Sequence, residues 1–497
     1  MKRVHHDLPI GYGSSDKVTG KPVPDCKLLK YAAIWVCFLV AGCETEHFSN
    51  PAAMMLDREA HTQARLAAER QLWQELSASG DANGFDAYLA ALAELAWSDR
   101  HPVQLRILAV DRLIELDAKQ FKHQADRRIR HVNEWLVLEH IYRRAAQEQW
   151  LDFTLIAVRR WAKPSQVYRD EDRPERRLLE KLNPGKAVDR ILLDVLGDQY
   201  EASQLTHHVS AWTVLNRIMD TESLRHELMK LKGQTMLIDN LHAAVAVLDV
   251  LPPDREGVLR LISLRCEQGG RYWQSAGEVS QRLSPGQKRG LALRHLPLLV
   301  NISEQQLQLS RDELAGEIRQ RLGRVRHYQR QVVGMDGYGY EAVNETIEEH
   351  LPTLTWADLI AISKILDAMT DGRLISEVFE QVDADFADQS TERGGVLIWA
   401  DERIVAKQFK PMAMDHDRVF YATPLLIEQM YTGLAHYHFH VQEYDNELHA
   451  GPGGGDLMFA DNLHASAVVF TFIDRNTLNI DYYQPGRVVV DLGVIKR

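Results

Sequence analysis

Apolar residues along this chain follow two different spacings, and the spacing changes between the first two thirds and the end. From about residue 57 to residue 330 they recur at three- and four-residue steps, as in Val103, Ile107 and Val110. This is the period of an α-helix with one buried face. After residue 390, apolar and polar residues alternate, as they do in a β-strand. The chain is therefore expected to be multidomain, with an all-α region followed by a mixed α/β domain.

Short turns divide the helical region into antiparallel pairs. Asn183-Pro184-Gly185 and Ser284-Pro285-Gly286 are two such turns. Stacked helix pairs of irregular length are typical of HEAT-like α-solenoids, in which each pair buries its face against its neighbours. A single large helical bundle is the alternative. A solenoid exposes a long concave surface, so this region is a candidate docking surface for a protein partner.

The length of 497 residues is too great for one compact core. A glycine-rich segment, residues 334–339, interrupts the helical period and marks a domain boundary. The helical region is expected to span residues 57–333, and the α/β domain residues 340–497. Just beyond the boundary, Thr355 and Asp358 have the spacing of a helix N-terminal cap.

The C-terminal domain is expected to contain one helix between strands of alternating pattern. The helix covers residues 424–432, and glycine and proline separate several of the strands. The predicted strands cover residues 395–399, 403–409, 434–441, 467–473, 478–483 and 488–494.

The N-terminus has the pattern of a targeting signal. Lysines precede an apolar run, residues 31–42, that is too short to span a bilayer and ends in Val40-Ala41-Gly42-Cys43. This segment resembles the signal and lipobox of bacterial lipoproteins. The resemblance implies a signal peptide over residues 1–42, a linker over 43–56, and a lipid anchor on the thiol of Cys43. Alternatively, the segment is an ordinary secretory signal or a signal anchor.

The lipoprotein resemblance also implies a location. The protein would be held on a membrane of the cell envelope and face the periplasm. Glu44 follows the cysteine in place of the aspartate that signals inner-membrane retention in that family, which favours the outer membrane.

Charge and cysteine content exclude two classes of protein. The formal net charge is -12 and no extended basic block is present, so a nucleic-acid-binding surface is not expected. Four cysteines are too few for a disulfide framework in a chain of this length. Cys266 follows Leu259 and Ile262 on an apolar helical face and is expected to be buried.

The C-terminal domain also carries the residues of a possible metal site. His438-Phe439-His440 places two imidazoles on the same face of one predicted strand. Asp456 follows in a glycine-rich loop and can supply a third ligand. A catalytic zinc takes three protein ligands and needs a separate base, for which Glu392, just before the first strand, is the candidate.

In this order the segments resemble the JAMM (MPN-type) zinc metalloprotease family. The matching segments are Glu392-Arg393-Gly394-Gly395, Tyr437-His438-Phe439-His440 and Pro452-Gly453-Gly454-Gly455-Asp456-Leu457. The resemblance implies that His438, His440 and Asp456 bind Zn²⁺ and that Glu392 is the general base. Gly453 stands where the family has the serine that stabilises the tetrahedral intermediate. The backbone N–H groups of Gly453 and Gly454 are the candidates to replace it.

The sequence therefore predicts a membrane-anchored zinc-dependent peptidase or isopeptidase that acts on protein or peptide substrates in the bacterial envelope. A non-catalytic scaffold lipoprotein with a degenerate JAMM-like binding domain is the alternative, because the serine is missing. A third possibility is hydrolysis of a non-peptide amide, for example in cell-wall material. Within the site, His436 shares the strand face with His438, so His436 and His438 are an alternative ligand pair.

Overall fold

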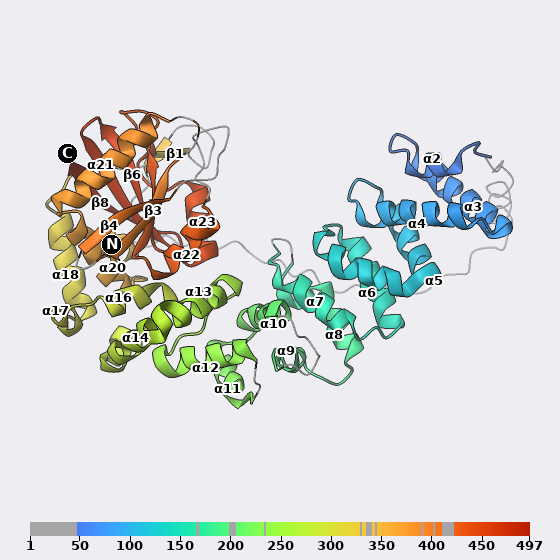
Figure 1. Cartoon of the computed structure of the whole chain (residues 1–497), viewed down its shortest axis with the longest axis horizontal. Helices are drawn as coiled ribbons and strands as arrows, with labels where there is room; N and C mark the ends of the chain where they lie inside the picture. Colours follow the sequence, from blue (N-terminus) through green and yellow to red (C-terminus); the bar gives the residue numbers. More distant parts are fainter. Residues whose placement is uncertain are drawn as a thin grey trace, which may run out of the picture. The chain divides into compact units, whose positions relative to one another are not determined.

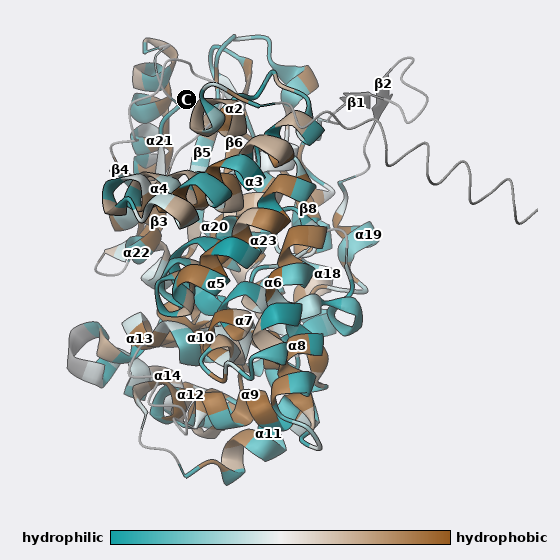
Figure 2. Cartoon of the chain, turned by 90° about the vertical axis from the view of Figure 1, so that its right-hand side faces the viewer, coloured by the Kyte–Doolittle hydropathy of each residue, from teal (hydrophilic) through white to brown (hydrophobic). Residues whose placement is uncertain are grey.

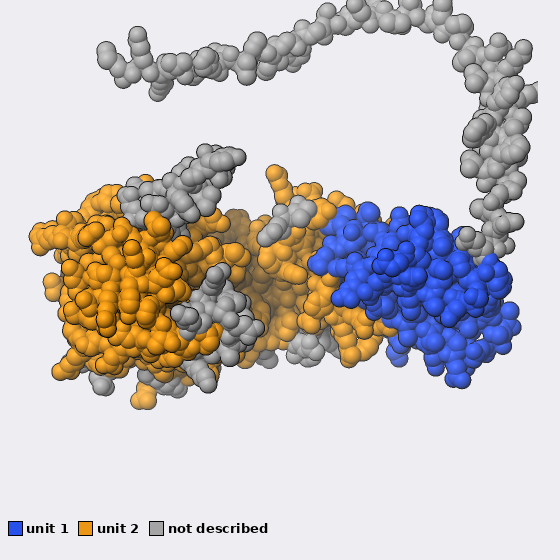
Figure 3. All heavy atoms as spheres, turned by 90° about the horizontal axis from the view of Figure 1, so that it is seen from above, with its two compact units in different colours: residues 1–121, 132–137 blue, residues 122–131, 138–497 orange. Residues whose placement is uncertain are grey.

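The computed structural model describes most of the chain from residue 47 onward. The described residues are 47–165, 168–197, 205–232, 235–328, 331–333, 340–342, 345–388, 390, 392–400, 403–409 and 422–497. Cys43, the predicted signal peptide and the glycine-rich boundary at residues 334–339 lie outside them. Contacts divide the chain into two compact units, residues 1–121 with 132–137, and residues 122–131 with 138–497 (Figure 3).

The first unit is helical, and a buried carboxylate lies in its core. Glu69 accepts hydrogen bonds from the Tyr88 hydroxyl at 2.5 Å and from Nε of Arg112 at 3.0 Å. The buried negative charge of Glu69 is therefore paired with the positive charge of Arg112. The helices that lie in this unit or begin in it are α2 (Pro51–Leu56), α3 (Thr62–Ser79), α4 (Ala82–Trp97), α5 (Val103–Arg128, interrupted at Asp117) and α6 (Trp135–Gln147).

The second unit begins as a succession of short helices (Figure 1). They are η1 (Ile129–His131), α7 (Phe153–Ala162), η2 (Asp170–Asp172), α8 (Pro174–Leu182), α9 (Val188–Leu196), α10 (Leu205–Ile218), α11 (Thr221–Lys230), α12 (Met236–Leu248), α13 (Arg255–Cys266), η3 (Glu267–Gly270), α14 (Arg271–Arg282), α15 (Pro285–Lys288), η4 (Leu293–His295), α16 (Leu296–Val300), α17 (Glu304–Gln308) and α18 (Arg311–Leu322).

These helices mostly contact helices near them in the sequence. Helix α10 packs on α7, α9 and α11, and α13 packs on α12 and α14. Most helices carry both hydrophobic and hydrophilic residues, as expected when only one side is buried (Figure 2). In the described part of the chain, no helix is long and apolar enough to span a membrane.

The predicted helical region and α/β domain are both present, and the α/β part contains a six-stranded sheet. Its strand order is β4-β3-β5-β6-β7-β8, with β5 and β6 parallel and the other neighbours antiparallel. The strands are β3 (Gly394–Ala400), β4 (Arg403–Phe409), β5 (Ala435–His440), β6 (Ala467–Asp474), β7 (Thr477–Gln484) and β8 (Val488–Lys496). A separate two-stranded sheet pairs β1 (Gln331–Val333) with β2 (Tyr340–Ala342). The other elements are α19 (Ile347–His350), α20 (Trp356–Ala368), α21 (Gly372–Phe386), α22 (Pro424–Thr432), η5 (Glu447–His449) and α23 (Gly454–Leu463).

Helices cover both faces of the six-stranded sheet. On one face, the Tyr437 hydroxyl donates to Gln381 of α21. On the other, Ala460 of α23 packs with Val469 and Tyr483. Gly395 of β3 lies opposite Tyr437 in the register, and a Cβ at that position would come within 2.6 Å of the Tyr437 hydroxyl oxygen. This strand position therefore requires glycine because the tyrosine fills the space.

Two local expectations from the sequence are wrong. The segment that carries Asp456 was expected to be a loop, but Gly454–Leu463 forms helix α23. Cys266 was expected to be buried but is exposed. The buried residues of α13 include Leu261 and Leu264, so Cys266 lies outside the face that packs into the core.

The end of the helical succession packs directly on the α/β part. Helix α13 contacts α22 and α23, and α18 contacts α20. At the start of α20, Thr355 and Asp358 form the predicted capping box. The Asp358 carboxylate also reaches Arg294 at 2.8 Å and His295 at 2.9 Å. Buried polar contacts thus join the two sequence regions within one compact unit.

Candidate metal centre

The strand β5 is the centre of the site. Because side chains alternate along a strand, His436, His438 and His440 project from the same face. Strand β5 lies between β3 and β6, and Gly394 of β3 is paired with His438. Glu392, two residues before Gly394, is therefore placed at the level of the histidines.

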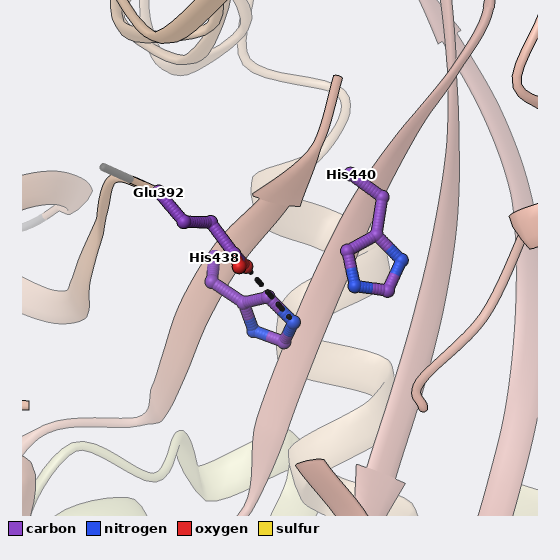
Figure 4. A group of neighbouring side chains, drawn as sticks. All are labelled: Glu392, His438 and His440. Atoms are coloured by element: carbon purple, nitrogen blue, oxygen red, sulfur yellow. Dashed lines mark ion pairs between the residues drawn. The ribbon is translucent and has the colours of Figure 1, made fainter. Parts of the chain in front are cut away.

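Four residues were predicted to form the metal site. In the structure, three of them form one group that could hold a metal ion. One ligand atom from each of Glu392, His438 and His440 lies within 4.8 Å of the others. The Glu392 Oε1 and His438 Nε2 atoms are 3.7 Å apart, and both side chains are buried. Figure 4 shows the Glu392 carboxylate against the His438 ring, with the His440 ring beside it.

Asp456 reaches the same place from helix α23. Its Oδ1 atom lies 3.4 Å from His438 Nε2, and its Oδ2 atom lies 3.7 Å from His440 Nε2. Asp456 is the third residue of the helix, and its Oδ2 accepts the N–H of the preceding Gly453 at 2.7 Å. This capping hydrogen bond fixes the carboxylate at the helix N-terminus, where its negative charge is favourable.

The Nδ1 atoms of His438 and His440 each have a partner on the side of the ring that faces away from the site. His440 Nδ1 lies 3.3 Å from the carbonyl oxygen of His449. A carbonyl can only accept, so His440 Nδ1 carries the hydrogen, and Nε2 of the neutral ring has a lone pair. His438 Nδ1 lies 3.4 Å from the Tyr483 hydroxyl. Such outer contacts orient the histidines that bind metals.

The charges at the site are strongly coupled. Burial lowers the pKa of His438, but the Asp456 and Glu392 carboxylates outweigh burial and raise this pKa to about 9. Burial and the neighbouring His438 lower the pKa of His440 to about 4. Burial would raise the pKa of Asp456, but the two histidines and the Gly453 N–H hold it well below its ordinary value. The pocket thus favours one positive charge between two carboxylates.

The remaining predicted site residues have different surroundings. The ring of His436 stacks 5.7 Å from that of His438, and burial holds its pKa well below the ordinary value. Gly453 already donates its N–H to Asp456. Gly454 is the first residue of α23, and the N–H groups of a first helical turn have no acceptor within the helix.

Sequence reasoning missed two buried residues beside the site. Tyr483 of β7 contacts His438, and Asp385 of α21 accepts the backbone N–H of Arg393 at 2.7 Å. Asp385 thereby holds the chain next to Glu392, and its charge also helps to raise the pKa of His438. Neither residue belongs to a short motif, so no local signal marks it.

No protein-family model, curated protein or solved structure matches the chain.

Proposed function

We propose that the α/β part is a zinc-dependent peptidase or isopeptidase centre of the JAMM type. His438, His440 and Asp456 are the proposed zinc ligands, and Glu392 is the proposed general base. The observation that best supports this proposal is the orientation of the His440 ring. The lone pair on His440 Nε2 is directed toward Asp456 Oδ2, 3.7 Å away. Both atoms are acceptors, so a cation between them is favourable.

The donor set fits zinc. Two imidazole nitrogens and one carboxylate form a common catalytic zinc set that leaves one coordination position open. Zinc in such a site supplies Lewis-acid chemistry, which polarises a carbonyl group and makes water more acidic. Both imidazoles present Nε2 inward, as the outer contacts of Nδ1 require.

Asp456, His438 and His440 would hold the zinc ion. Glu392 would accept a proton from the water that attacks the carbonyl carbon and return it to the leaving nitrogen. The buried position of Glu392, 3.7 Å from His438, supports this role because the carboxylate is adjacent to the ligands. Gly454 is the better of the two backbone donors for the developing oxyanion, because Gly453 donates to Asp456.

A second candidate function is binding without catalysis. The observation in its favour is that the family's serine is absent and that the N–H of Gly453 is already used by Asp456. In this case the chain would be a scaffold, and the solenoid-like helical region would supply the docking surface for a protein partner. Metal would then bind without hydrolysis.

Replacement of Glu392 separates the two functions. Glu392→Gln should keep zinc near one equivalent per chain while hydrolysis of a peptide and isopeptide library falls by a factor of about 100 to 10,000. His440→Ala or Asp456→Ala should lose zinc itself. His436→Ala is the matched control on the same strand face and should retain it.

The outcomes are distinguished by elemental analysis beside the hydrolysis assay. Zinc-free wild-type protein after purification in zinc-supplemented buffer would eliminate the metalloenzyme. Loss of zinc from Glu392→Gln would make Glu392 a ligand instead of the base. Zinc binding with no hydrolysis of any substrate would favour the scaffold.

We also propose that the protein is a lipoprotein of the bacterial envelope, anchored through Cys43 and facing the periplasm. The apolar run that ends in Val40-Ala41-Gly42-Cys43 supports this. Cys43→Ser should leave the product without lipid and move it to the aqueous phase in detergent partitioning. Unchanged partitioning of this variant would contradict the anchor.

A further inference from the structure

A groove of about 920 Å³ lies within the second unit, beside the C-terminal end of α23. Its walls come from α7, α10 and the beginning of α13, and Asn462 of α23 lies at one side. Ala162, Leu205, Val209 and Leu259 supply much of its apolar lining. A volume of this size suits a short peptide segment or a small ligand.

Cations outnumber anions along this groove. The lining contains Arg130, Arg159, Lys163, Arg217 and Arg255 against Asp254 and Glu256. Three of the cations are neutralised, because Arg159, Arg217 and Arg255 pair with Asp126, Asp170 and Glu256.

The other two cations of the groove have no carboxylate partner among the described residues. Arg130 and Lys163 are exposed, and in the described part of the chain neither has a carboxylate within ion-pair distance. The chain as a whole has a net charge of -12. An anionic partner is therefore repelled by the molecule in general and attracted at this groove.

We propose that the groove binds an extended, acidic segment of the protein substrate, with apolar side chains on the lining and carboxylates on Arg130 and Lys163. This proposal rests on the proposed hydrolase function, because it assigns the groove to the substrate of that centre. Charge complementarity of this kind contributes to specificity and association rate.

Helix α23 connects one side of the groove to the zinc centre. Helix α23 has ten residues, with Asp456 in its first turn and Asn462 in its last. Asp456 and Asn462 are six positions apart, so about 9 Å of helix separates them, and an extended peptide needs roughly three residues to cover that length. The acidic segment should therefore lie at least about three residues from the cleaved bond.

Binding can be measured separately from hydrolysis. The full-length protein, treated with EDTA, is titrated into a fluorescein-labelled peptide in which glutamate alternates with leucine, and anisotropy is recorded. Arg130→Glu with Lys163→Glu should raise the dissociation constant at least about tenfold. The matched control reverses two exposed cations of the same unit outside the groove, Lys181→Glu with Lys232→Glu, and should leave binding unchanged. Circular dichroism checks that both variants are folded.

Three results would overturn the proposal. They are an equal loss of binding in the control variant, equal affinity for the peptide with lysine in place of glutamate, and binding to anionic phospholipid vesicles but not to the peptide. If the wild-type protein binds the peptide but contains no zinc after purification in zinc-supplemented buffer, the groove stands as a peptide-binding site and the hydrolase proposal fails.

Discussion

Two tyrosines are adjacent on β7 and point to opposite faces of the sheet. Tyr483 contacts Nδ1 of His438 at 3.4 Å. Tyr482 donates to Gln484 at 2.7 Å and lies 3.1 Å from the Ser466 hydroxyl. Both rings are fully buried. The pair therefore offers a comparison in which only one hydroxyl touches the metal centre.

Tyr483→Phe should weaken zinc binding by about 10- to 100-fold, because an outer partner orients the ligand ring. Tyr482→Phe should leave zinc affinity unchanged, although each variant loses a hydroxyl contact and about 1 kcal/mol of stability. Zinc titration against a competing chelator, with thermal melts of both variants, checks this. Equal losses of zinc affinity would mean that the hydroxyl of Tyr483 has no specific role.

At the residue scale, the sequence could predict the candidate ligands but not their supports. His438 and His440 follow from strand alternation within three residues. Tyr483 lies 45 positions beyond His438, and their contact depends on the order of strands in the sheet. Spacing along the chain gives no information about that order.

At the scale of elements, the strands were predictable because short apolar runs are bounded by glycine and proline, although both faces of the sheet are covered and β7 is buried along its whole length. Helix α23 was not, because Gly453, Gly454 and Gly455 have low helix propensity and are typical of a turn. The helix begins among them because Asp456 caps Gly453, and its apolar residue Ala460 packs onto the sheet. Tertiary contacts thus stabilise helix α23 although its first residues have low helix propensity.

Helix α20 is tied to the short helix η4 by buried polar groups. His295 Nδ1 accepts the N–H of Ala292 at 3.1 Å, and Nε2 lies 2.9 Å from Asp358. A neutral imidazole with its hydrogen on Nε2 satisfies both contacts. Burial and the charge of Arg294 lower the pKa of His295 in agreement with this form.

This arrangement predicts a stability that depends on pH. The pKa of His295 is lower in the folded protein than the ordinary value of about 6.5. Below about pH 7 the unfolded chain therefore binds more protons, and the free energy of unfolding falls as the pH decreases. Denaturant unfolding between about pH 7.5 and pH 5.5 measures the effect.

His295→Gln should remove part of that dependence, whereas His226→Gln, at an exposed position, should not. A pH profile unchanged in His295→Gln would show that other groups cause the dependence.

Asp358→Asn should lower the free energy of unfolding by about 3 kcal/mol at neutral pH, because it leaves Arg294 without its buried charged partner.

At the scale of the whole molecule, the predicted boundary at residues 334–339 is crossed by contacts. Helices α13 and α18 precede it and pack on α22, α23 and α20. Asp358 and its partners Arg294 and His295 also lie on opposite sides of it. The change of hydrophobic period locates a change of architecture, but it does not show which surfaces pack together.

A fragment of residues 340–497 should consequently be less stable than one of residues 250–497. Only the longer fragment retains α13, η4, α16 and α18, and the shorter one leaves Asp358 without its charged partners, at a cost of roughly 3 kcal/mol or more. Thermal unfolding of the two fragments beside the full chain tests this. Equal melting temperatures would show that residues 340–497 are an independent domain.

The contacts between α13 and the end of α23 join residues far apart in the sequence. Asp254 binds His464 across 210 positions at 2.8 Å, and Arg260 binds the His464 carbonyl across 204 positions. During synthesis, α13 leaves the ribosome long before its partner exists. At 5 to 20 residues per second, that interval is roughly 10 to 40 s. The nascent helical region must remain soluble through this delay with one of its contact faces still uncovered.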